Sequence, residues 1–306
     1  MKVLVATEKP FAPVALDQIK DLTEKAGYEF ATLEKYEDKS ELLNAVSDVD
    51  ALIIRSDKVT PEVIGAANNL KIVVRAGAGY DNVDLPSASE KGVIVMNTPG
   101  QNSNAVAELA IGMMIYMARG KYNGKAGTEL KGKKLGIHAY GNVGRLVANI
   151  AKGFGMEIAA YDPFISKESM ESEGVKVYDS AEDLYKNCQY ISLHIPANDQ
   201  TKNSINYDLL NNMPSGATLV NTARKEVVNE EELVKLMESR SDFKYASDIA
   251  PNNADLLLEK FDSQCYFTPK KMGAQTAEAN INAGIAAINQ IIGFIENGDT
   301  TFQVNK

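Results

Sequence analysis

The stretch KKLGIHAYGNVGRLVANIAKGF, residues 133–154, decides the fold of this chain. Its first six residues predict a short strand, and a glycine-rich turn follows directly. Beyond the turn, apolar residues recur at helical spacing: Val143, Val147, Ile150 and Phe154. A strand, a glycine-rich turn and a helix in this order predict a βαβ unit of a parallel sheet.

The turn itself, AYGNVG at residues 139–144, fits the dinucleotide-binding pattern G-x-G-x-x-G, except that Ala139 replaces the first glycine. In such a turn, backbone amides and the positive end of the following helix meet a pyrophosphate. The second glycine lets the backbone approach the phosphates, and the third lets the helix pack on the strand. The residues expected to contact the dinucleotide are Tyr140, Gly141, Asn142, Val143 and Gly144.

An acidic residue after the next strand indicates which dinucleotide is bound. Residues 157–161, EIAAY, predict that strand, and Asp162 ends it eighteen residues after Gly144. An aspartate at this place accepts hydrogen bonds from the ribose hydroxyls and repels a 2′-phosphate. The sequence therefore favours NAD over NADP; the alternative is an ordinary βαβ turn, with Asp162 a loop residue before Pro163.

Short apolar runs alternate with amphipathic stretches along the rest of the chain. Continuous apolar strands of four or five residues, separated by helices, indicate parallel sheets covered on both faces. Two series of strands are expected, 2–6, 51–54, 71–74 and 93–96, then 133–138, 157–161, 190–195, 217–221 and 244–247. Long apolar helices are expected over 105–120 and 277–298. The sequence thus predicts an α/β fold with two doubly wound parallel-sheet (Rossmann-like) domains.

Composition limits the function and the location. The length of 306 residues suits two domains, and a net charge of -9 with a pI near 5.0 disfavours nucleic acid as a partner. Cys188 and Cys265 have neither the spacing of a zinc site nor that of a disulfide framework, so we expect no metal. No apolar run is long enough for a signal peptide or a membrane span, and we expect a cytoplasmic protein with no membrane partner.

Several segments together resemble the D-2-hydroxyacid dehydrogenase family, and within it the D-3-phosphoglycerate dehydrogenases. They follow the family's order along nearly the whole chain: VVRAGAGYDNVDL (73–85), NTPGQNSNAVAELAIG (97–112), GKKLGIHAYGNVGR (132–145), YDPF (161–164), SLHIP (192–196) and NTARKEVVNEEEL (221–233). The resemblance implies a substrate-binding domain of residues 1–97 plus 278–306, an NAD-binding domain of residues 98–277, and a catalytic cleft between them. It also implies a homodimer, and NAD-dependent oxidation of 3-phosphoglycerate to 3-phosphohydroxypyruvate, the first step of L-serine biosynthesis.

The substrate residues would come from the first series of strands. Free amides of Ala76, Gly77, Ala78 and Gly79 at a strand end could form an anion cradle, although glycines there also suit a tight turn. Arg55 and Arg75 each close a strand, where ligands of α/β folds gather. Their positions resemble the phosphate-binding arginines of phosphoglycerate dehydrogenases; salt bridges to Asp57 or Asp81 are the alternative.

Further roles follow from the resemblance. Arg224 matches the arginine that binds the carboxylate and polarises the carbonyl, and Asp248 matches the acid that orients the nicotinamide carboxamide. The alternatives are a surface arginine in an interdomain salt bridge and a bare aspartate at a strand end. Residues that match the cofactor wall, where we expect backbone contacts and no proton role for the histidine, are His194, Pro196, Thr222 and Ala223.

The chain departs from the family at the acid/base group. Most members pair a histidine with a glutamate, whereas TPKKMGAQT (268–276) has Lys271 in the histidine's place, and Asn252 and Asn253 lie near the glutamate's place. A lysine needs no carboxylate to stay protonated, because its ordinary pKa of about 10.4 is far above the value of about 6.5 for histidine. We expect Lys271 to carry the proton and oxidation to be fastest at alkaline pH. Lys270 is the rival, and a solvated pair of lysines is the remaining alternative.

Two other functions stay open. One is a dehydrogenase of an unphosphorylated 2-hydroxy acid such as glycerate. The other is a non-catalytic dinucleotide-binding sensor or scaffold, which the loss of the histidine and glutamate favours. Retention of Arg224, of the anion cradle and of a basic residue at the proton position argues for an enzyme.

Overall fold

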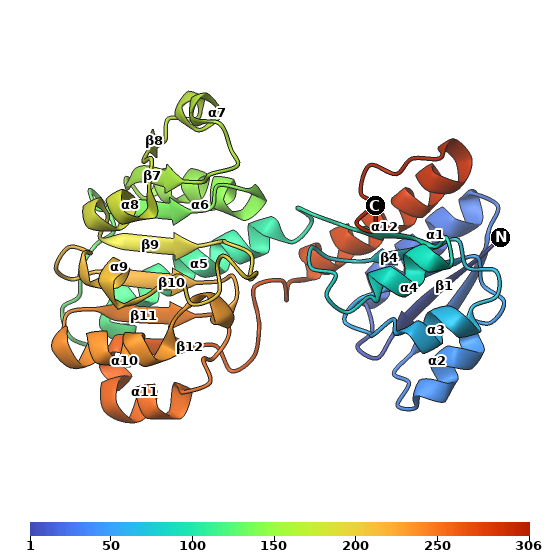
Figure 1. Ribbon diagram of the computed structural model, residues 1–306, viewed down its shortest axis with the longest axis horizontal. Coiled ribbons are helices and arrows are strands. Elements are labelled where there is room, and N and C mark those ends of the chain that lie inside the picture. The colour runs from blue at the N-terminus through green and yellow to red at the C-terminus, as the bar shows by residue number, and fades with distance from the viewer. The chain divides into compact units, whose positions relative to one another are not determined.

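The computed structural model describes residues 1–306, which fold as two compact units (Figure 1). Unit 1 comprises Met1–Asn102 and Gln275–Lys306, and unit 2 comprises Ser103–Ala274. Each unit contains one sheet in which all the paired strands are parallel, with five strands in unit 1 and seven in unit 2. The prediction of two doubly wound α/β units is therefore confirmed.

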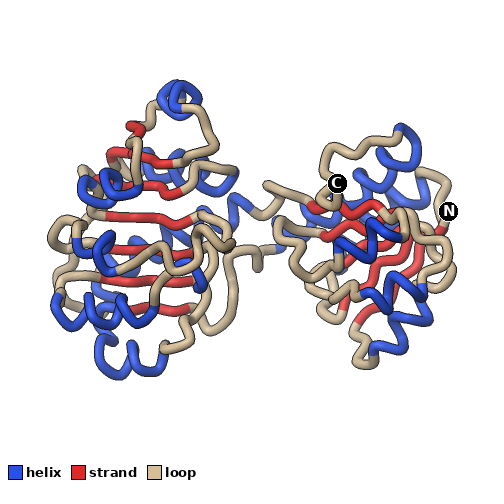
Figure 2. The backbone as a smooth tube through the Cα atoms, in the orientation of Figure 1, coloured by secondary structure: helices blue, strands red, loops and turns tan.

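Unit 1 has the strand order β2-β1-β3-β4-β5, with helices on both faces of the sheet (Figure 2). Its strands are β1 (Lys2–Thr7), β2 (Glu29–Glu34), β3 (Ala51–Ile54), β4 (Ile72–Arg75) and β5 (Ile94–Asn97). Its helices are α1 (Pro13–Lys25), α2 (Lys39–Ala45), α3 (Pro61–Ala66), α4 (Leu85–Glu90) and α12 (Ala277–Asn297).

Two apolar cores lie on opposite faces of this sheet, because successive side chains of a strand point to opposite sides. Val3 and Val5 of β1 pack in the core with α1 and α12, whereas Leu4 and Ala6 pack in the core with α2, α3 and α4. Both faces are thus buried, and ligands of unit 1 have access to the sheet only at its edges and ends.

Unit 2 has the strand order β12-β11-β10-β9-β6-β7-β8. Strands that follow β6 in the sequence are added first on one side of it and then, from β9 onward, on the other side. Its strands are β6 (Lys134–His138), β7 (Glu157–Tyr161), β8 (Lys176–Val177), β9 (Tyr190–Leu193), β10 (Thr218–Asn221), β11 (Lys244–Ser247) and β12 (Cys265–Phe267). Its α-helices are α5 (Ser103–Ala118), α6 (Asn142–Gly153), α7 (Lys167–Ser172), α8 (Ala181–Asn187), α9 (Tyr207–Asn211), α10 (Glu230–Ser239) and α11 (Ala254–Phe261). Short 3₁₀ turns are Gly120–Tyr122, Lys225–Val227 and Asp262–Gln264.

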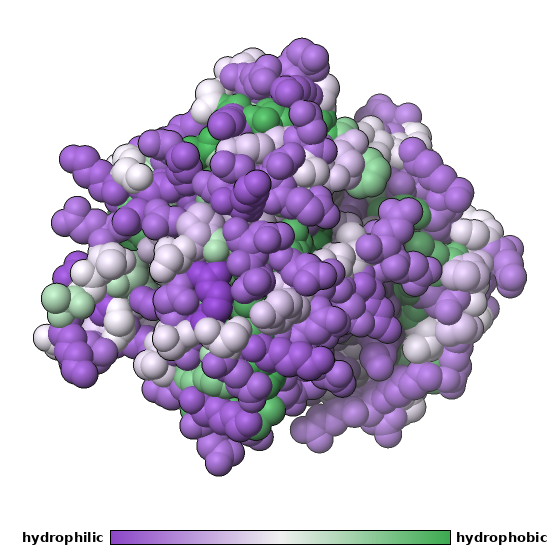
Figure 3. Space-filling view, turned by 60° about the vertical axis from the view of Figure 1, so that its left-hand side comes forward, coloured by the Kyte–Doolittle hydropathy of each residue, from purple (hydrophilic) through white to green (hydrophobic).

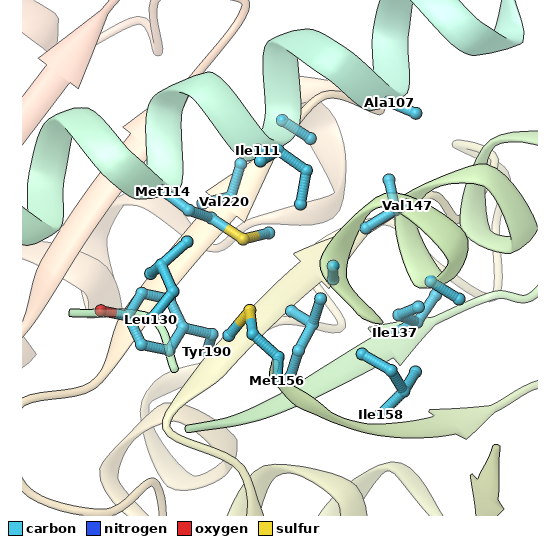
Figure 4. Close-up of a cluster of buried hydrophobic side chains, with 14 of the residues drawn as sticks. Ala107, Ile111, Met114, Leu130, Ile137, Val147, Met156, Ile158, Tyr190 and Val220 are labelled. Atoms are coloured by element: carbon cyan, nitrogen blue, oxygen red, sulfur yellow. The ribbon is translucent and has the colours of Figure 1, made fainter. Parts of the chain in front are cut away.

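The apolar stretch predicted as a helix over 105–120 is α5, and it packs inside unit 2 against α6 and β10. Figure 4 shows Ile111 and Met114 of α5 gathered with Val147 of α6 and with Val220 of β10. The apolar residues of α5 are therefore buried in the core of its own unit.

Three strands were not predicted, namely β2, β8 and β12. The strand β2 is EFATLE, whose residues are all at least partly exposed, so no continuous apolar run marks it. The other two are only two and three residues long. All three are edge strands, where burial on both faces is not required.

The surface agrees with the composition. The face in Figure 3 is mostly hydrophilic, with small hydrophobic areas between hydrophilic residues. None of the helices combines the length and the apolarity that a membrane span requires.

Candidate active site

The predicted residues follow the carboxyl ends of parallel strands, so each unit gathers its own set at one end of its sheet. In unit 2 they follow β6, β7, β9, β10, β11 and β12. In unit 1 they follow β3 and β4. The two sets are described in turn.

The glycine turn joins β6 to α6 as predicted, and its two glycines meet different surroundings. A methyl group on Gly144 would lie 2.5 Å from the carbonyl oxygen of Ala139, so only glycine lets α6 pack on β6. A methyl group on Gly141 would meet no atom within 4 Å, so this side of the turn is open to a ligand. Ala139, in place of the first glycine, has a φ of 78°, a region that costs a side chain about 1–2 kcal/mol.

The first backbone amides of α6 have no side-chain cap and can bind an anion. Gly141 is its N-cap, and no side chain caps the helix, whereas side chains cap α7, α8, α9 and α10. The first amides of an α-helix have no partner within the helix. With the helix dipole, these amides form an anion site, and the open side of Gly141 leaves room for a pyrophosphate.

Asp162 lies beside this turn and fixes it. Its Oδ2 accepts the N–H of Tyr140 at 2.7 Å, and its Oδ1 accepts the N–H of Phe164 at 2.8 Å. The carboxylate thus stands at the end of β7, next to the turn, where the ribose of a dinucleotide would lie. An uncapped helix, an open glycine and this carboxylate together fit NAD.

The side chain of Tyr140 does not face this open side. Its hydroxyl donates to Oε2 of Glu173 at 3.0 Å, and the guanidinium of Arg145 lies 5.1 Å from its ring centre and forms an ion pair with Glu173. A contact of Tyr140 with a dinucleotide would therefore come from its backbone. This cluster, which ties α6 to the end of α7, was not predicted because Glu173 is 33 residues from Tyr140.

Both histidine rings lie beside hydroxyl groups of neighbouring residues. Burial lowers the pKa of His138 to about 4 and that of His194 to about 3, so both rings are neutral. The His138 ring lies 3.1 Å from the hydroxyl of Tyr185, and the His194 ring lies 3.0 Å from the hydroxyl of Ser192. Nearby, Thr222 lies 3.4 Å from the His194 ring, and the carbonyl of the exposed Pro196 accepts from Thr201.

Arg224 is presented by a turn that Asn221 builds. The side chain of Asn221 accepts the N–H of Ala223 at 2.9 Å and donates to the carbonyl of Arg224 at 2.9 Å. The guanidinium of Arg224 donates to the carbonyl of Ala223 at 3.0 Å and forms no ion pair with a carboxylate. Within unit 2, the guanidinium therefore has no carboxylate partner and can meet an anionic ligand.

Asp248 anchors the segment that carries the two lysines. It is buried at the end of β11, and its carboxylate accepts the N–H of Met272 and the N–H of Gly273, each at 2.7 Å. The hydroxyl of Thr268 donates to the carbonyl and to Oδ1 of the same residue, at 2.7 Å and 3.1 Å. Residues 268 and 272–273 are thus fixed, and the exposed Lys270 and Lys271 lie between these two points.

Asn252 and Asn253 are held by helix α10. The backbone N–H of Asn252 donates to both carboxylate oxygens of Glu230, at 2.9 Å and 3.0 Å. The side chain of Asn253 donates to the carbonyl of Glu230 at 3.2 Å. Lys225 donates to the side chain of Asn252 at 2.6 Å, so these asparagines form part of a local network around the start of α10.

In unit 1, carbonyl groups of the loop after β4 accept hydrogen bonds from the end of β5, whereas several of its amides donate none. The carbonyl of Gly77 accepts the N–H of Thr98 at 2.9 Å, and that of Ala78 accepts the side-chain amide of Asn97 at 2.6 Å. The amides of Gly77, Ala78 and Gly79 donate no hydrogen bond within the protein. The prediction of a free amide at Ala76 is wrong, because this N–H donates to Ile54 at 2.8 Å and continues the sheet.

The two arginines lie at the same end of the sheet. Nε of Arg75 donates to the carbonyl of Arg55 at 2.9 Å, and its guanidinium lies so close to Gly77 that a side chain there would collide with it. Arg55 donates to the carbonyls of Lys9 at 3.1 Å and Pro10 at 2.9 Å, and to the side chain of Asn280. Asp57 accepts the main-chain N–H of Arg55 at 3.2 Å. Arg75 thus lies beside the cradle, and the carbonyl of Arg55 holds its side chain there.

Comparisons with known proteins agree with this geometry. Residues 106–269 match the family described as D-isomer specific 2-hydroxyacid dehydrogenase, NAD binding domain. A hydroxypyruvate reductase of Thermotoga maritima is 37% identical over 271 residues, which cover 83% of this chain and 87% of the relative. A D-3-phosphoglycerate dehydrogenase of Methanocaldococcus jannaschii is 37% identical over 297 residues, which cover 91% of this chain and 55% of the relative.

A solved structure is similar over its whole length. The crystal structure of an NAD⁺-bound 3-phosphoglycerate dehydrogenase of Entamoeba histolytica is 46% identical, with a TM-score of 0.90, covering 100% of this chain and 99% of that one. The chain spans about half the length of the phosphoglycerate dehydrogenases of M. jannaschii and Synechocystis, 55% and 48% respectively. With the matched family domain and the site described above, the chain belongs to the D-2-hydroxyacid dehydrogenase family and binds NAD.

Proposed function

We propose that this chain oxidises 3-phosphoglycerate to 3-phosphohydroxypyruvate with NAD, as the first step of L-serine biosynthesis, and that Lys271 is the acid/base. The observation that carries the proposal is the guanidinium of Arg75 beside Gly77 in the anion cradle. A cradle of amides suits one carboxylate, and an additional fixed cation suits a second, dianionic group on the same substrate. The similarity to the phosphoglycerate dehydrogenase of E. histolytica supports the same substrate.

In this proposal, residues 1–97 plus 278–306 bind the substrate and residues 98–277 bind NAD. Amides of the cradle and the guanidinium of Arg224 hold the carboxylate, and Arg224 polarises the carbonyl as it forms. Arg75 binds the phosphate, and Arg55 keeps the loop around residues 9–10 and α12 in place beside it.

The dinucleotide is held by the open turn at Gly141, the first amides of α6 and the carboxylate of Asp162, with contacts from the cofactor wall at residues 194–196 and 222–223. When bound, NAD accepts the hydride. Asp248 would meet the carboxamide of its nicotinamide, with the same carboxylate that fixes residues 272–273.

The proton of the substrate hydroxyl passes to Lys271. Support comes from the anchor at Asp248, which holds the amide of Met272, the residue directly after Lys271. Lys270 is one residue further from this anchor. Because a neutral amine is the base, oxidation should become faster as the pH rises toward the alkaline range.

A second candidate is a dehydrogenase of an unphosphorylated acid, such as glycerate. It is favoured by the similarity to the hydroxypyruvate reductase of T. maritima, which the chain covers over most of its length. The hydrogen bonds of Arg55 also favour it. Three of the five guanidinium N–H groups of that residue already donate to protein oxygens, so few donors remain for a phosphate. Arg75→Ala separates the two candidates, since it should weaken binding of 3-phosphoglycerate and leave binding of glycerate nearly unchanged.

The test is the absorbance of NADH after the protein is mixed with NAD and 3-phosphoglycerate at alkaline pH, beside glycerate as the alternative substrate. We expect turnover of the phosphorylated acid. Lys271→Ala should lower kcat by about 10²–10⁴, the usual effect of losing a general base, and Lys270→Ala is the matched control. If Lys270→Ala loses the activity instead, the assignment moves to Lys270. If NAD binds but no 2-hydroxy acid turns over in either direction, the proposed reaction and the role of Lys271 are wrong, and the dinucleotide sensor becomes the function to test.

The proposal includes a homodimer in a reducing, cytoplasmic compartment. Cys188 and Cys265 are free and buried, and burial raises the pKa of each thiol to about 12. Both are thus protonated and unreactive. Light scattering would measure the mass of the assembly.

A further inference from the structure

We propose that Asn97 is a positioning residue of the anion cradle, which holds the loop after β4 so that the amide of Gly79 faces the bound carboxylate. Asn97 is the last residue of β5 and pairs with Arg75 of β4 in the sheet. The inference rests on the proposed function, since it names the residue that shapes the substrate site.

The first step of the argument is the geometry of the peptide bond. In a trans peptide the carbonyl of one residue and the N–H of the next point in opposite directions, and the chain contains no cis peptide. The direction in which a carbonyl is held therefore sets the direction of the next N–H. Fixing the carbonyls of the loop toward the protein turns its amides outward.

Two bonds do this in the loop. The backbone N–H of Thr98 holds the carbonyl of Gly77, at 2.9 Å, and so directs the amide of Ala78. The side-chain amide of Asn97 holds the carbonyl of Ala78, at 2.6 Å, and so directs the amide of Gly79. One of these donors is main chain and present with any residue, whereas the other exists only because residue 97 is an asparagine.

Asn97 is itself fixed. It is buried, with 9% of its surface exposed, and its backbone carbonyl accepts the side-chain amide of Gln290 from α12 at 3.0 Å. The backbone that carries this side chain is therefore held by both β5 and α12. This ties the amide of Gly79 to the rigid sheet, as a preorganised anion site requires.

The identity of residue 97 decides the effect. An aspartate has the same shape but no N–H to donate, so it would place a carboxylate against the carbonyl of Ala78. The carbonyl would turn away from it, and the amide of Gly79 would rotate with the peptide. Added negative charge beside the cradle would also repel a bound anion.

The first experiment compares Asn97→Asp with wild type in steady-state kinetics. We expect KM for 3-phosphoglycerate to rise by about tenfold or more, as for the loss of one hydrogen bond to a charged group, with KM for NAD nearly unchanged. Asn305→Asp is the matched control, because Asn305 also donates from its side chain to a backbone carbonyl of unit 1, that of Val93 at 2.8 Å. A general loss of stability would affect both variants, whereas a positioning role affects only Asn97→Asp.

The second experiment is independent of turnover. Amide chemical shifts of ¹⁵N-labelled full-length protein are followed as oxalate, a simple dicarboxylate, is added. We expect oxalate to shift the amides of Ala78 and Gly79 in wild type. In Asn97→Asp the shift of Gly79 should be lost, while that of Ala78, directed by the backbone of Thr98, should be reduced less. If Asn97→Asp does not fold, Gln290→Leu provides the second variant, with the same pattern in weaker form.

The outcomes separate the inference from the proposed function. If oxalate shifts these amides in wild type, the shift of Gly79 is lost in Asn97→Asp and 3-phosphoglycerate is not oxidised, the proposed substrate is wrong and the role of Asn97 stands. If Gly79 responds to oxalate equally in wild type and in the folded variant, the role of Asn97 is wrong. The same conclusion follows if Asn305→Asp raises KM for the substrate as much as Asn97→Asp does.

Discussion

At the scale of single residues, the two histidines make stability depend on pH. Burial lowers the pKa of His138 to about 4, although Asp162 and Glu182 oppose the shift, and burial lowers the pKa of His194 to about 3. In the unfolded chain each ring has its ordinary pKa of about 6.5. Between these values the unfolded chain binds more protons than the folded chain, so stability is complete above pH 6.5 and is lost as the pH falls.

We therefore expect the free energy of unfolding to decrease by about 1.4 kcal/mol per pH unit for each histidine below about pH 6. Urea unfolding at several pH values between neutral and about pH 5 would measure it. Glutamine cannot be charged, so His138→Gln should reduce the dependence of the unfolding free energy on pH by the contribution of one histidine. An unfolding free energy that does not change over this range would show that the rings are not kept neutral.

The residue scale also shows where sequence reasoning stops. The roles of Gly141 and Gly144 follow from a local motif and could be predicted. The bond from Asn97 to Ala78 joins positions 19 residues apart, and the bonds from Asp248 to residues 272–273 span 24 and 25 residues. No local pattern marks such pairs. The prediction of a free amide at Ala76 is wrong because the hydrogen bonds of the sheet continue to Ala76, two residues beyond the apolar run.

At the scale of elements, two substitutions at the junction of β6 and α6 separate helix packing from ligand binding. In Gly144→Ala the new methyl group would meet the carbonyl oxygen of Ala139 at 2.5 Å, so the helix must move away from the strand. In Gly141→Ala the methyl group meets no protein atom, and the φ of −75° suits alanine.

We expect Gly144→Ala to lower the free energy of unfolding by about 1–3 kcal/mol, as overpacking does. Gly141→Ala should leave stability nearly unchanged and weaken NAD binding by about tenfold or more, because its methyl group occupies space that the pyrophosphate needs. Thermal unfolding without NAD and calorimetric titration with NAD would measure the two effects. A Gly141→Ala protein with normal NAD affinity would mean that the pyrophosphate does not lie on this side of the turn.

Strands could be predicted from the sequence where burial on both faces of the sheet requires a run of apolar residues. The central strands β1, β3, β4, β6 and β9 are buried along most of their length and read as apolar runs. The edge strand β2 alternates instead between partly buried and exposed residues. Edge strands lack neighbours on one side, so their sequences carry a weaker signal.

At the scale of the whole molecule, NAD should stabilise one unit more than the other. The residues that fit NAD all belong to unit 2, whereas unit 1 has separate apolar cores. A ligand at a hundred times its Kd stabilises the part of the protein that binds it by about 2.7 kcal/mol.

Hydrogen exchange in moderate urea, with and without NAD, would test this. We expect slower exchange with NAD in peptides from β6 and β9, and a smaller change in peptides from β1 and β3. The Gly141→Ala protein serves as the control, since its response to NAD should be weaker. Equal protection of both units would indicate that they unfold together as one cooperative block.

The anchor at Asp248 has a consequence for how such a chain can change over time. The carboxylate binds the main-chain amides of residues 272 and 273 and the hydroxyl of Thr268, and it touches neither lysine side chain in these bonds. Every amino acid except proline supplies the same amide. The loop can therefore keep its path while the side chain at position 271 is exchanged, so an amine in place of an imidazole, as we propose for the proton carrier, needs no rebuilding of the backbone that presents it.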